Sequence, residues 1–169
     1  KIVIIFCLIS CIIIPAAISQ NNKIDSLQNE LKKVTADTSK VNLLNALALQ
    51  FLYKDAAKAS QYASEALELS EKINYKKGIS EALFQSGNIA DAQGETKKAL
   101  EFFNQSMKLF EELSQEIKIA DNLINIASIY LNQGDYEIAI NYFLKSAVLA
   151  EKLADKKRMR WSYNNLGAS

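Results

Sequence analysis

The chain has 169 residues, a formal net charge of +1 and 49% hydrophobic residues. The balanced charge gives no general attraction to nucleic acid, and the lack of histidine excludes an imidazole base, metal ligand or phosphoacceptor from this sequence. Five glycines and one proline are few breaks in a composition rich in helix-forming residues, so we expect an all-α protein. Both cysteines, Cys7 and Cys11, lie near the N-terminus and no glycine-rich phosphate loop is present, so we expect no cofactor and no metal site.

The N-terminal segment is strongly apolar. Lys1 precedes residues 2–14, in which only Ser10 is polar, and the small residues Ala17 and Ser19 come just before a polar sequence. This order is typical of a secretory signal peptide, which we place at residues 1–19. Two alternatives stay open: an uncleaved anchor, because the apolar run is about 17 residues long, and a lipoprotein signal ending at Cys11. Cleavage or lipidation would place the rest of the chain on the exported side of a membrane.

Residues 20–39 are expected to form an N-terminal capping helix and a linker. Ile24, Leu27, Leu31 and Val34 share one face at helical spacing, which predicts a short amphipathic helix over residues 23–34. This helix would cover the otherwise bare end of the helices that follow. Residues 35–39 then form a break that offers N-cap side chains to the next helix.

The rest of the chain repeats itself with a period of 40 residues, and residues 83–113 align with residues 123–153 without a gap. Residues 83–89 align with residues 123–129, and further aligned pairs are Gly94 and Gly134, Ala99 and Ala139, and Phe103 and Phe143. A fixed period of this length indicates a repeat array, which we place at residues 40–169.

Each repeat is expected to contain two helices joined by a turn. The expected pairs are residues 40–53 and 57–73, residues 75–93 and 96–113, and residues 117–133 and 136–153, with residues 161–169 starting a fourth repeat. Gly94 and Gly134 stand at the turns of the second and third pairs, where a helix C-terminus favours a left-handed residue. The first pair is degenerate, because its turn has no glycine and its first helix aligns best with one residue deleted.

The two regular repeats share a pattern of small, aromatic and turn residues. These are Leu83, Gly87, Gly94, Ala99, Phe103 and Ser106, and then Leu123, Ala127, Tyr130, Gly134, Asp135, Tyr136, Ala139, Phe143 and Ala147. The pattern resembles the tetratricopeptide repeat, which implies a solenoid of antiparallel helix pairs. Gly87 and Ala127 would let paired helices approach closely, and Phe103 and Phe143 would fill the space between adjacent repeats. The period is longer than the common repeat of about 34 residues, and glutamates replace the usual closing proline.

In the family that the sequence resembles, the first helix of each pair lines a concave surface. The resemblance implies a peptide-binding groove made of Asn42, Asn45, Leu49, Leu52, Glu81, Phe84, Asn88, Asp91, Asp121, Ile124, Asn125, Ser128, Asn132, Trp161, Asn164 and Asn165. Asparagine amides both donate and accept hydrogen bonds, so they suit the backbone of an extended peptide. The alternative is that these residues are solvated surface.

The charges at these positions predict what the groove would accept. No lysine or arginine occupies them, so a neutral or basic peptide is expected rather than an acidic C-terminal tail. Residues 156–160 form the main basic run and are expected to be a solvated helix start.

The expected function is non-catalytic recognition of a protein or peptide, and nucleic acid is not an expected partner. Long, proline-free repeats that follow a secretion signal resemble the exported N-terminal region of bacterial membrane sensors of the histidine kinase or helix-turn-helix regulator type. That resemblance implies a sensory role on the periplasmic or cell-envelope face, with membrane contact through the N-terminal segment or a downstream helix, and any kinase output beyond residue 169. The alternatives are a free periplasmic or secreted scaffold and a cytoplasmic regulator with an N-terminal anchor. The exposed start of the fourth repeat is expected to fray or to self-associate.

Overall fold

A computed structural model describes residues 22–35 and 37–167 of the chain. Residues 22–31 are helical, and seven helices follow: α2 (Thr38–Phe51), α3 (Ala56–Lys72), α4 (Lys76–Ala92), α5 (Thr96–Glu112), α6 (Glu116–Gln133), α7 (Tyr136–Lys152) and α8 (Lys156–Leu166). Within these ranges there is no strand. The predicted all-α fold is therefore confirmed, whereas the predicted signal peptide and its alternatives concern residues 1–19, which lie outside the described part.

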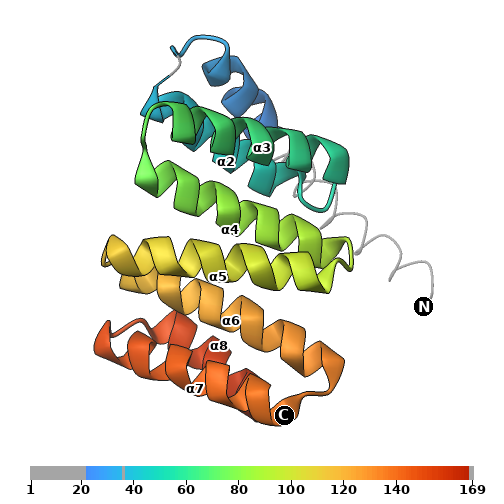
Figure 1. Ribbon diagram of the computed structural model, residues 1–169, viewed down its shortest axis with the longest axis vertical. Helices are drawn as coiled ribbons and strands as arrows, with labels where there is room; N and C mark the ends of the chain where they lie inside the picture. The colour runs from blue at the N-terminus through green and yellow to red at the C-terminus, as the bar shows by residue number, and fades with distance from the viewer. Residues whose placement is uncertain (1–21, 36, 168–169) are drawn as a thin grey trace, which may run out of the picture.

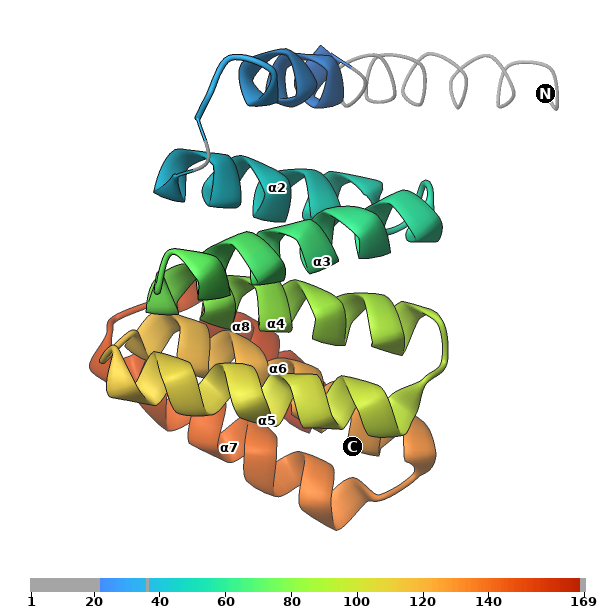
Figure 2. The ribbon, with the colours of Figure 1, turned by 45° about the horizontal axis from the view of Figure 1, so that its top comes forward.

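The helices stack as antiparallel pairs along one axis. Figure 1 shows α2 and α3 at one end of the stack and α6, α7 and α8 at the other, and Figure 2 shows the curved, layered arrangement from a second side. Packing is most extensive between α4 and α5 and between α6 and α7, the two regular pairs. Each first helix also contacts the first helix of the next pair, as α2 contacts α4. None of the helices in the described ranges is long and apolar enough to cross a membrane.

The observed helix boundaries differ from the expected ones mainly at the two ends of the array. The first helical segment ends at residue 31, three residues earlier than expected, and the next helix begins after Asp37, whose carboxylate accepts from the backbone N–H groups of Ser39 and Lys40. Helix α8 begins at Lys156, five residues before the expected start of the fourth repeat. The reason is again an aspartate N-cap, because Asp155 accepts from the N–H groups of Lys157 and Arg158.

Left-handed residues end most of the helices. Gly94 (φ +75°) and Gly134 (φ +83°) occupy the turns within the two regular pairs, as expected. The turns between pairs use Asn74, Ser114 and Ala154, with φ between +51° and +54°, and these three residues also follow one another at the repeat period. The residue that follows each of them donates its backbone N–H to the carbonyl oxygen five positions earlier, as Tyr75 N does to Ser70 O at 2.8 Å. These turns are Schellman-type caps made without glycine.

Aromatic side chains from the second helix of each regular pair fill the core. Phe103 and Phe143 are fully buried, whereas their neighbours Phe102 and Tyr142 are half-buried at the edge of the same clusters. Phe103 packs with Ala90 and Ala99 of its own pair and with Ile126 of α6. An added Cβ at Gly87 would lie 2.6 Å from the Phe103 ring, so glycine sets the close approach of α4 and α5.

Two kinds of polar contact recur with the repeat. Ser106 Oγ donates to Ser80 O at 2.9 Å, and one period later Ser146 Oγ donates to Ala120 O at 3.3 Å, so in both regular pairs a buried hydroxyl ties the second helix to the first. In the same two pairs an ion pair also joins the start of the first helix to the end of the second. In α4 and α5 it is Lys76 to Glu112 at 2.9 Å, whereas in α6 and α7 it is Glu116 to Lys152, with the signs reversed.

Candidate peptide-binding groove

The first helices of successive pairs are joined side by side by polar contacts between predicted groove residues and their neighbours. Between α2 and the segment that opens α4, Tyr75 Oη donates to Asn42 Oδ1 and Asn45 Nδ2 donates to Gly78 O, each at 3.4 Å. Between α4 and α6, Asn125 Nδ2 donates to Asn88 Oδ1 at 2.8 Å. The structure therefore brings the predicted residues of consecutive repeats onto one continuous face.

Glu81 does not stand as a free acid on this face. Lys118 of α6 places its Nζ 2.9 Å from the Glu81 carboxylate, and the same ammonium lies 5.9 Å from the centre of the Phe84 ring. Both members of the ion pair are partly buried, so the pair is less screened than an exposed one. Lys118 therefore occupies the part of the groove next to Phe84 and neutralises the charge that the sequence suggested there.

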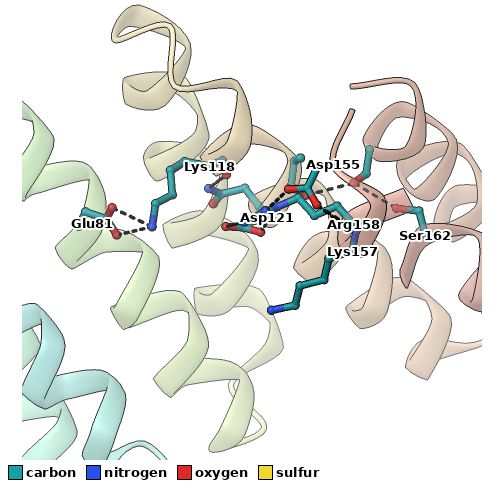
Figure 3. Close-up of polar contacts among 10 residues, drawn as sticks. Glu81, Lys118, Asp121, Asp155, Lys157, Arg158 and Ser162 are labelled. Atoms are coloured by element: carbon teal, nitrogen blue, oxygen red, sulfur yellow. Dashed lines mark hydrogen bonds and ion pairs between the residues drawn. The ribbon is translucent and has the colours of Figure 1, made fainter. Parts of the chain in front are cut away.

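Arg158 forms the strongest polar cluster of the face. Its guanidinium donates to both oxygens of Asp121, from Nε at 2.8 Å and from Nη2 at 2.9 Å, and Nη1 contacts the N-cap residue Asp155 (Figure 3). Such a bidentate pair fixes the orientation of both side chains. The hydrogen bonds to Asp121 raise the pKa of Arg158 above its ordinary value, while the backbone N–H of Arg158 holds the pKa of Asp155 below its ordinary value.

A cavity of about 680 Å³ lies between α6 and α8 at this end of the face. It is lined by five predicted residues, Asp121, Ile124, Asn125, Trp161 and Asn164, and by three cations, Lys157, Arg158 and Arg160. Trp161 is 55% exposed although its indole is large and apolar. The side chains of Lys157 and Arg160 have no ion pair within the described residues, and Figure 3 shows the Lys157 ammonium extending away from the Asp121–Arg158 cluster.

No lysine or arginine occupies the predicted positions themselves, but cations from neighbouring positions reach them. Lys118 lies one helical turn before Asp121, and Arg158 pairs with Asp121. Residues 156–160 form the start of α8, where Lys156, Lys157 and Arg160 are exposed as expected. A signal was present in the sequence, because Lys118 follows Glu81 by 37 residues and Arg158 follows Asp121 by the same interval. That interval differs from the repeat period, because it joins residues that face each other across two neighbouring helices.

Several predicted groove residues have other roles. Asn45 is only 6% exposed, Leu52 is buried in the first core cluster, and Ile124 is buried although it touches the cavity, so these three are mainly packing residues. The Oδ1 atom of Asn45 is buried without a hydrogen-bond partner. Ser128 and Asn165 donate to carbonyls of their own helices, at Ile124 and Trp161.

The remaining predicted residues are spread along the face rather than gathered at the cavity. Leu49, Asp91 and Asn132 are exposed, and desolvation raises the pKa of the Asp91 carboxyl. Among the described residues, no group of three or more acidic or sulfur ligands could hold a metal ion. The groups on this face are therefore amides, one exposed indole and cations, which are suited to binding a protein or peptide ligand.

Two segments of the chain, residues 80–112 and 120–152, match the tetratricopeptide repeat family. They are tetratricopeptide repeats. The two matches begin at residues 80 and 120, exactly one period apart, so the predicted period is confirmed. A comparison with curated proteins gives no match.

Solved structures with tetratricopeptide or similar folds superpose on most of the chain. The signal transduction ATPase (STAND protein) with a tetratricopeptide repeat sensor from Pyrococcus horikoshii is 21% identical, with a TM-score of 0.75 over 87% of this chain. BtubC from P. vanneervenii is 22% identical, with a TM-score of 0.69 over 89%, and a Rap protein complexed with competence and sporulation factor is 20% identical, with a TM-score of 0.76 over 86%. At this identity the likeness shows the fold alone. The chain spans 23%, 62% and 42% of the lengths of these three chains.

Proposed function

We propose that this tetratricopeptide repeat scaffold binds an extended segment of a protein partner in the cavity between α6 and α8. The observation that carries the proposal is the exposed indole of Trp161 beside cations that have no ion-pair partner within the described residues. Concave ligand sites typically combine aromatic side chains with a few polar groups that fix the ligand's orientation, and this cavity has both. A repeat scaffold of this kind fits a protein or peptide ligand.

The polar groups around Trp161 define the ligand further. Asn125 uses its Nδ2 to donate to Asn88, which leaves its Oδ1 able to accept from a peptide N–H. Arg158 is already paired with Asp121 and Asp155, so its charge is not available to a ligand. The positive charges of Lys157 and Arg160 would attract an acidic side chain or a terminal carboxylate. The ligand is therefore an extended segment with an apolar side chain for Trp161 and an acidic group near it. This changes the expectation of a neutral or basic peptide.

The test is a selection of short random peptides displayed against the protein. We expect sequences that combine an apolar and an acidic residue, and we expect Arg160→Glu to weaken their binding about tenfold or more by reversing a charge at the site. Trp161 is the sole tryptophan of the chain, so its emission should shift on binding in the wild-type protein. The control is Tyr53→Ser, which changes an exposed aromatic residue outside the cavity.

Two results would contradict the proposal. One is a selection that enriches no peptide family, and the other is a family that binds Trp161→Ala and Arg160→Glu as tightly as the wild type. For any enriched family, Tyr53→Ser should bind as tightly as the wild type.

The wider context that we propose is the sensory or interaction region of an exported or membrane-anchored signalling protein. The apolar segment before residue 20 supports export, and the fold likeness to a tetratricopeptide repeat sensor supports a sensory role. The alternatives are a free exported scaffold and a cytoplasmic regulator with an anchor. Reporter enzymes fused after Ser169 distinguish them: activity of a reporter that works only after export supports export, and activity of a cytoplasm-only reporter contradicts it.

A further inference from the structure

Helix α7 carries an exposed apolar stripe that is separate from the peptide cavity. Ile140, Leu144, Val148 and Leu149 lie at helical spacing along one face, around a shallow hollow of about 620 Å³ that shares no residue with the cavity between α6 and α8. Leu144 is 48% exposed and Val148 is 66% exposed. We call these four residues the α7 stripe.

The stripe is special to the third repeat. At the positions one period earlier, α5 has Asn104 and Lys108 where α7 has Leu144 and Val148, and α3 has Ser64 and Glu68 one period before that. All four of these polar residues are exposed or half-exposed. Helix α5 is followed by a full further pair, α6 and α7, and that pair leaves Asn104 and Lys108 uncovered. A further repeat packed in the same way would therefore also leave Leu144 and Val148 uncovered.

The charges at the two ends of the stripe are opposite, so the stripe can pair with the same stripe of a second copy. Glu137 lies at the N-terminal end of the stripe and Lys152 at the C-terminal end. If a second α7 helix packs antiparallel about a two-fold axis between Leu144 and Lys145, Glu137 of each copy lies opposite the other copy's Lys152. The same axis places Ile140 opposite Leu149. An axis of this kind uses the same patch on both copies, which is the commonest arrangement in homo-oligomers.

We propose that the α7 stripe is the interface of a homodimer in which two α7 helices pack antiparallel. Ile140 and Leu149 of the two copies bury each other, and the two Glu137–Lys152 pairs set the register. Asn141 and Lys145 also line the hollow, so Val148 packs beside the other copy's Asn141 and Leu144 packs on the alkyl part of the other copy's Lys145, whose ammonium lies over the Tyr142 ring of its own chain. The helix dipoles oppose each other favourably. Lys152 already pairs with Glu116 of its own chain, so each end of the interface becomes a three-residue cluster. The peptide cavity of each copy stays open, which gives a scaffold with two ligand sites.

The experiment uses charge reversal and mixing. The mass of the full chain is measured by light scattering from about 1 μM to 1 mM, in a non-ionic detergent used at the same level for every variant. Glu137→Lys places two lysines opposite each other at both ends of its homodimer, and Lys152→Glu does the same with two glutamates. We expect each variant alone to dimerise about tenfold or more weakly than the wild type. An equimolar mixture of the two variants should form a mixed dimer with opposite charges at both ends, and its dissociation constant is compared with those of the two components alone.

The mixed dimer has a defined charge pattern. One end sets the new lysine of the Glu137→Lys copy against the new glutamate of the Lys152→Glu copy, so that end is an opposite-charge pair. The other end sets the native Glu137 of the second variant against the native Lys152 of the first, which is the wild-type pair. Both ends of the mixed dimer therefore carry opposite charges, and we expect its dissociation constant to return to within about threefold of the wild type.

The mixture shows whether weaker dimerisation of the variants comes from lost pairing across the interface or from a change within each monomer. The contact of Glu116 with residue 152 is disturbed in the Lys152→Glu homodimer and in the same variant within the mixed dimer, so only the proposed pairing explains a recovery. A second variant, Leu144→Asn with Val148→Lys, gives α7 the residues that α5 carries at the same places and should leave a monomer that keeps the wild-type helical circular dichroism. Tyr53→Ser should dimerise as the wild type does.

Three results would overturn the proposal. The first is a wild-type chain that stays monomeric over the whole range, which would leave the stripe to a different partner. The second is a mixture that dimerises no better than its two components. The third is a Leu144→Asn, Val148→Lys variant whose dimerisation is unchanged.

Discussion

Replacing Gly87 by alanine should destabilise the protein, although the same change normally stabilises a helix interior. The gain in helix propensity is about 1 kcal/mol. Against it, the new methyl carbon would lie 2.6, 2.7 and 3.0 Å from three carbons of the Phe103 ring, well inside the contact distance of about 3.5–4.0 Å. Phe103 is fully buried, so either its ring or the two helices must shift to relieve this contact. Overpacking of this kind costs about 1–3 kcal/mol or more.

Subtracting the gain in helix propensity from the overpacking cost leaves an expected loss of up to about 2 kcal/mol in the free energy of unfolding. For a chain of this size that corresponds to a fall of up to about 8 °C in the melting temperature. The assay is thermal and urea unfolding followed by circular dichroism. Phe103→Leu should largely relieve the clash, so the double variant should show a coupling free energy of about 0.5–3 kcal/mol between the two sites.

The next repeat supplies a matched control. Ala127 stands one period after Gly87 and packs against the fully buried Phe143. Ala127→Gly should also destabilise, because it removes a buried methyl group and lowers helix propensity. Two results would refute this reasoning. One is a higher melting temperature for Gly87→Ala, and the other is a double variant in which Gly87→Ala and Phe103→Leu show no coupling free energy. Either would mean that the close approach of α4 and α5 does not require glycine at position 87.

Three further predictions concern packing, turns and pH. Ala139→Trp should lower the free energy of unfolding by about 1–3 kcal/mol or more, because Ala139 is fully buried beside Phe143; an unchanged urea midpoint would show that the repeat register is wrong. Ala154→Gly should raise it by up to about 1 kcal/mol, because Ala154 has a φ of +51° that glycine adopts without strain, and calorimetry showing a loss instead would mean that the turn is unstrained. Hydrogen bonds hold the pKa of Asp155 below its ordinary value of 3.8, so the stability that it contributes is present above that value and is lost as the pH falls through the lower folded-state pKa. The unfolding midpoint of Asp155→Asn should therefore match the wild type more closely at acidic pH, near or below the ordinary value, than near neutrality, and equal differences in the two ranges would contradict this role.

Much of the fold could be predicted because the repeat makes each position visible twice. Phe103 and Phe143, or Ser106 and Ser146, align at one period and have the same burial in both places. The glycines at positions 94 and 134 marked two turns correctly. The turns at Asn74, Ser114 and Ala154 could not be predicted in this way, because no residue type recurs there.

The groove was harder to predict than the fold. Whether an amide such as Asn45 or Asn125 is buried or exposed depends on how the neighbouring first helix is rotated, and that rotation is not encoded in the spacing of one helix. The positions of Lys118 and Arg158 follow from contacts between helices that are one repeat apart. Residues 80–112 and 120–152 thus fix the scaffold, whereas the recognition surface depends on the geometry between repeats.

The reversed ion pairs at the helix ends bear on how the chain finds its native arrangement. A polypeptide with near-duplicate segments can join the wrong partners while it folds, for example α4 with α7 in place of α5. Packing α4 against α7 would place Lys76 opposite Lys152, and packing α6 against α5 would place Glu116 opposite Glu112. Both incorrect pairs of helices would therefore bring like charges together. Each correct pair is exposed and adds little to the stability of the final state. Their effect is on pairing specificity. Because the signs are reversed between the two pairs, each ion pair forms only when a helix packs against its correct partner.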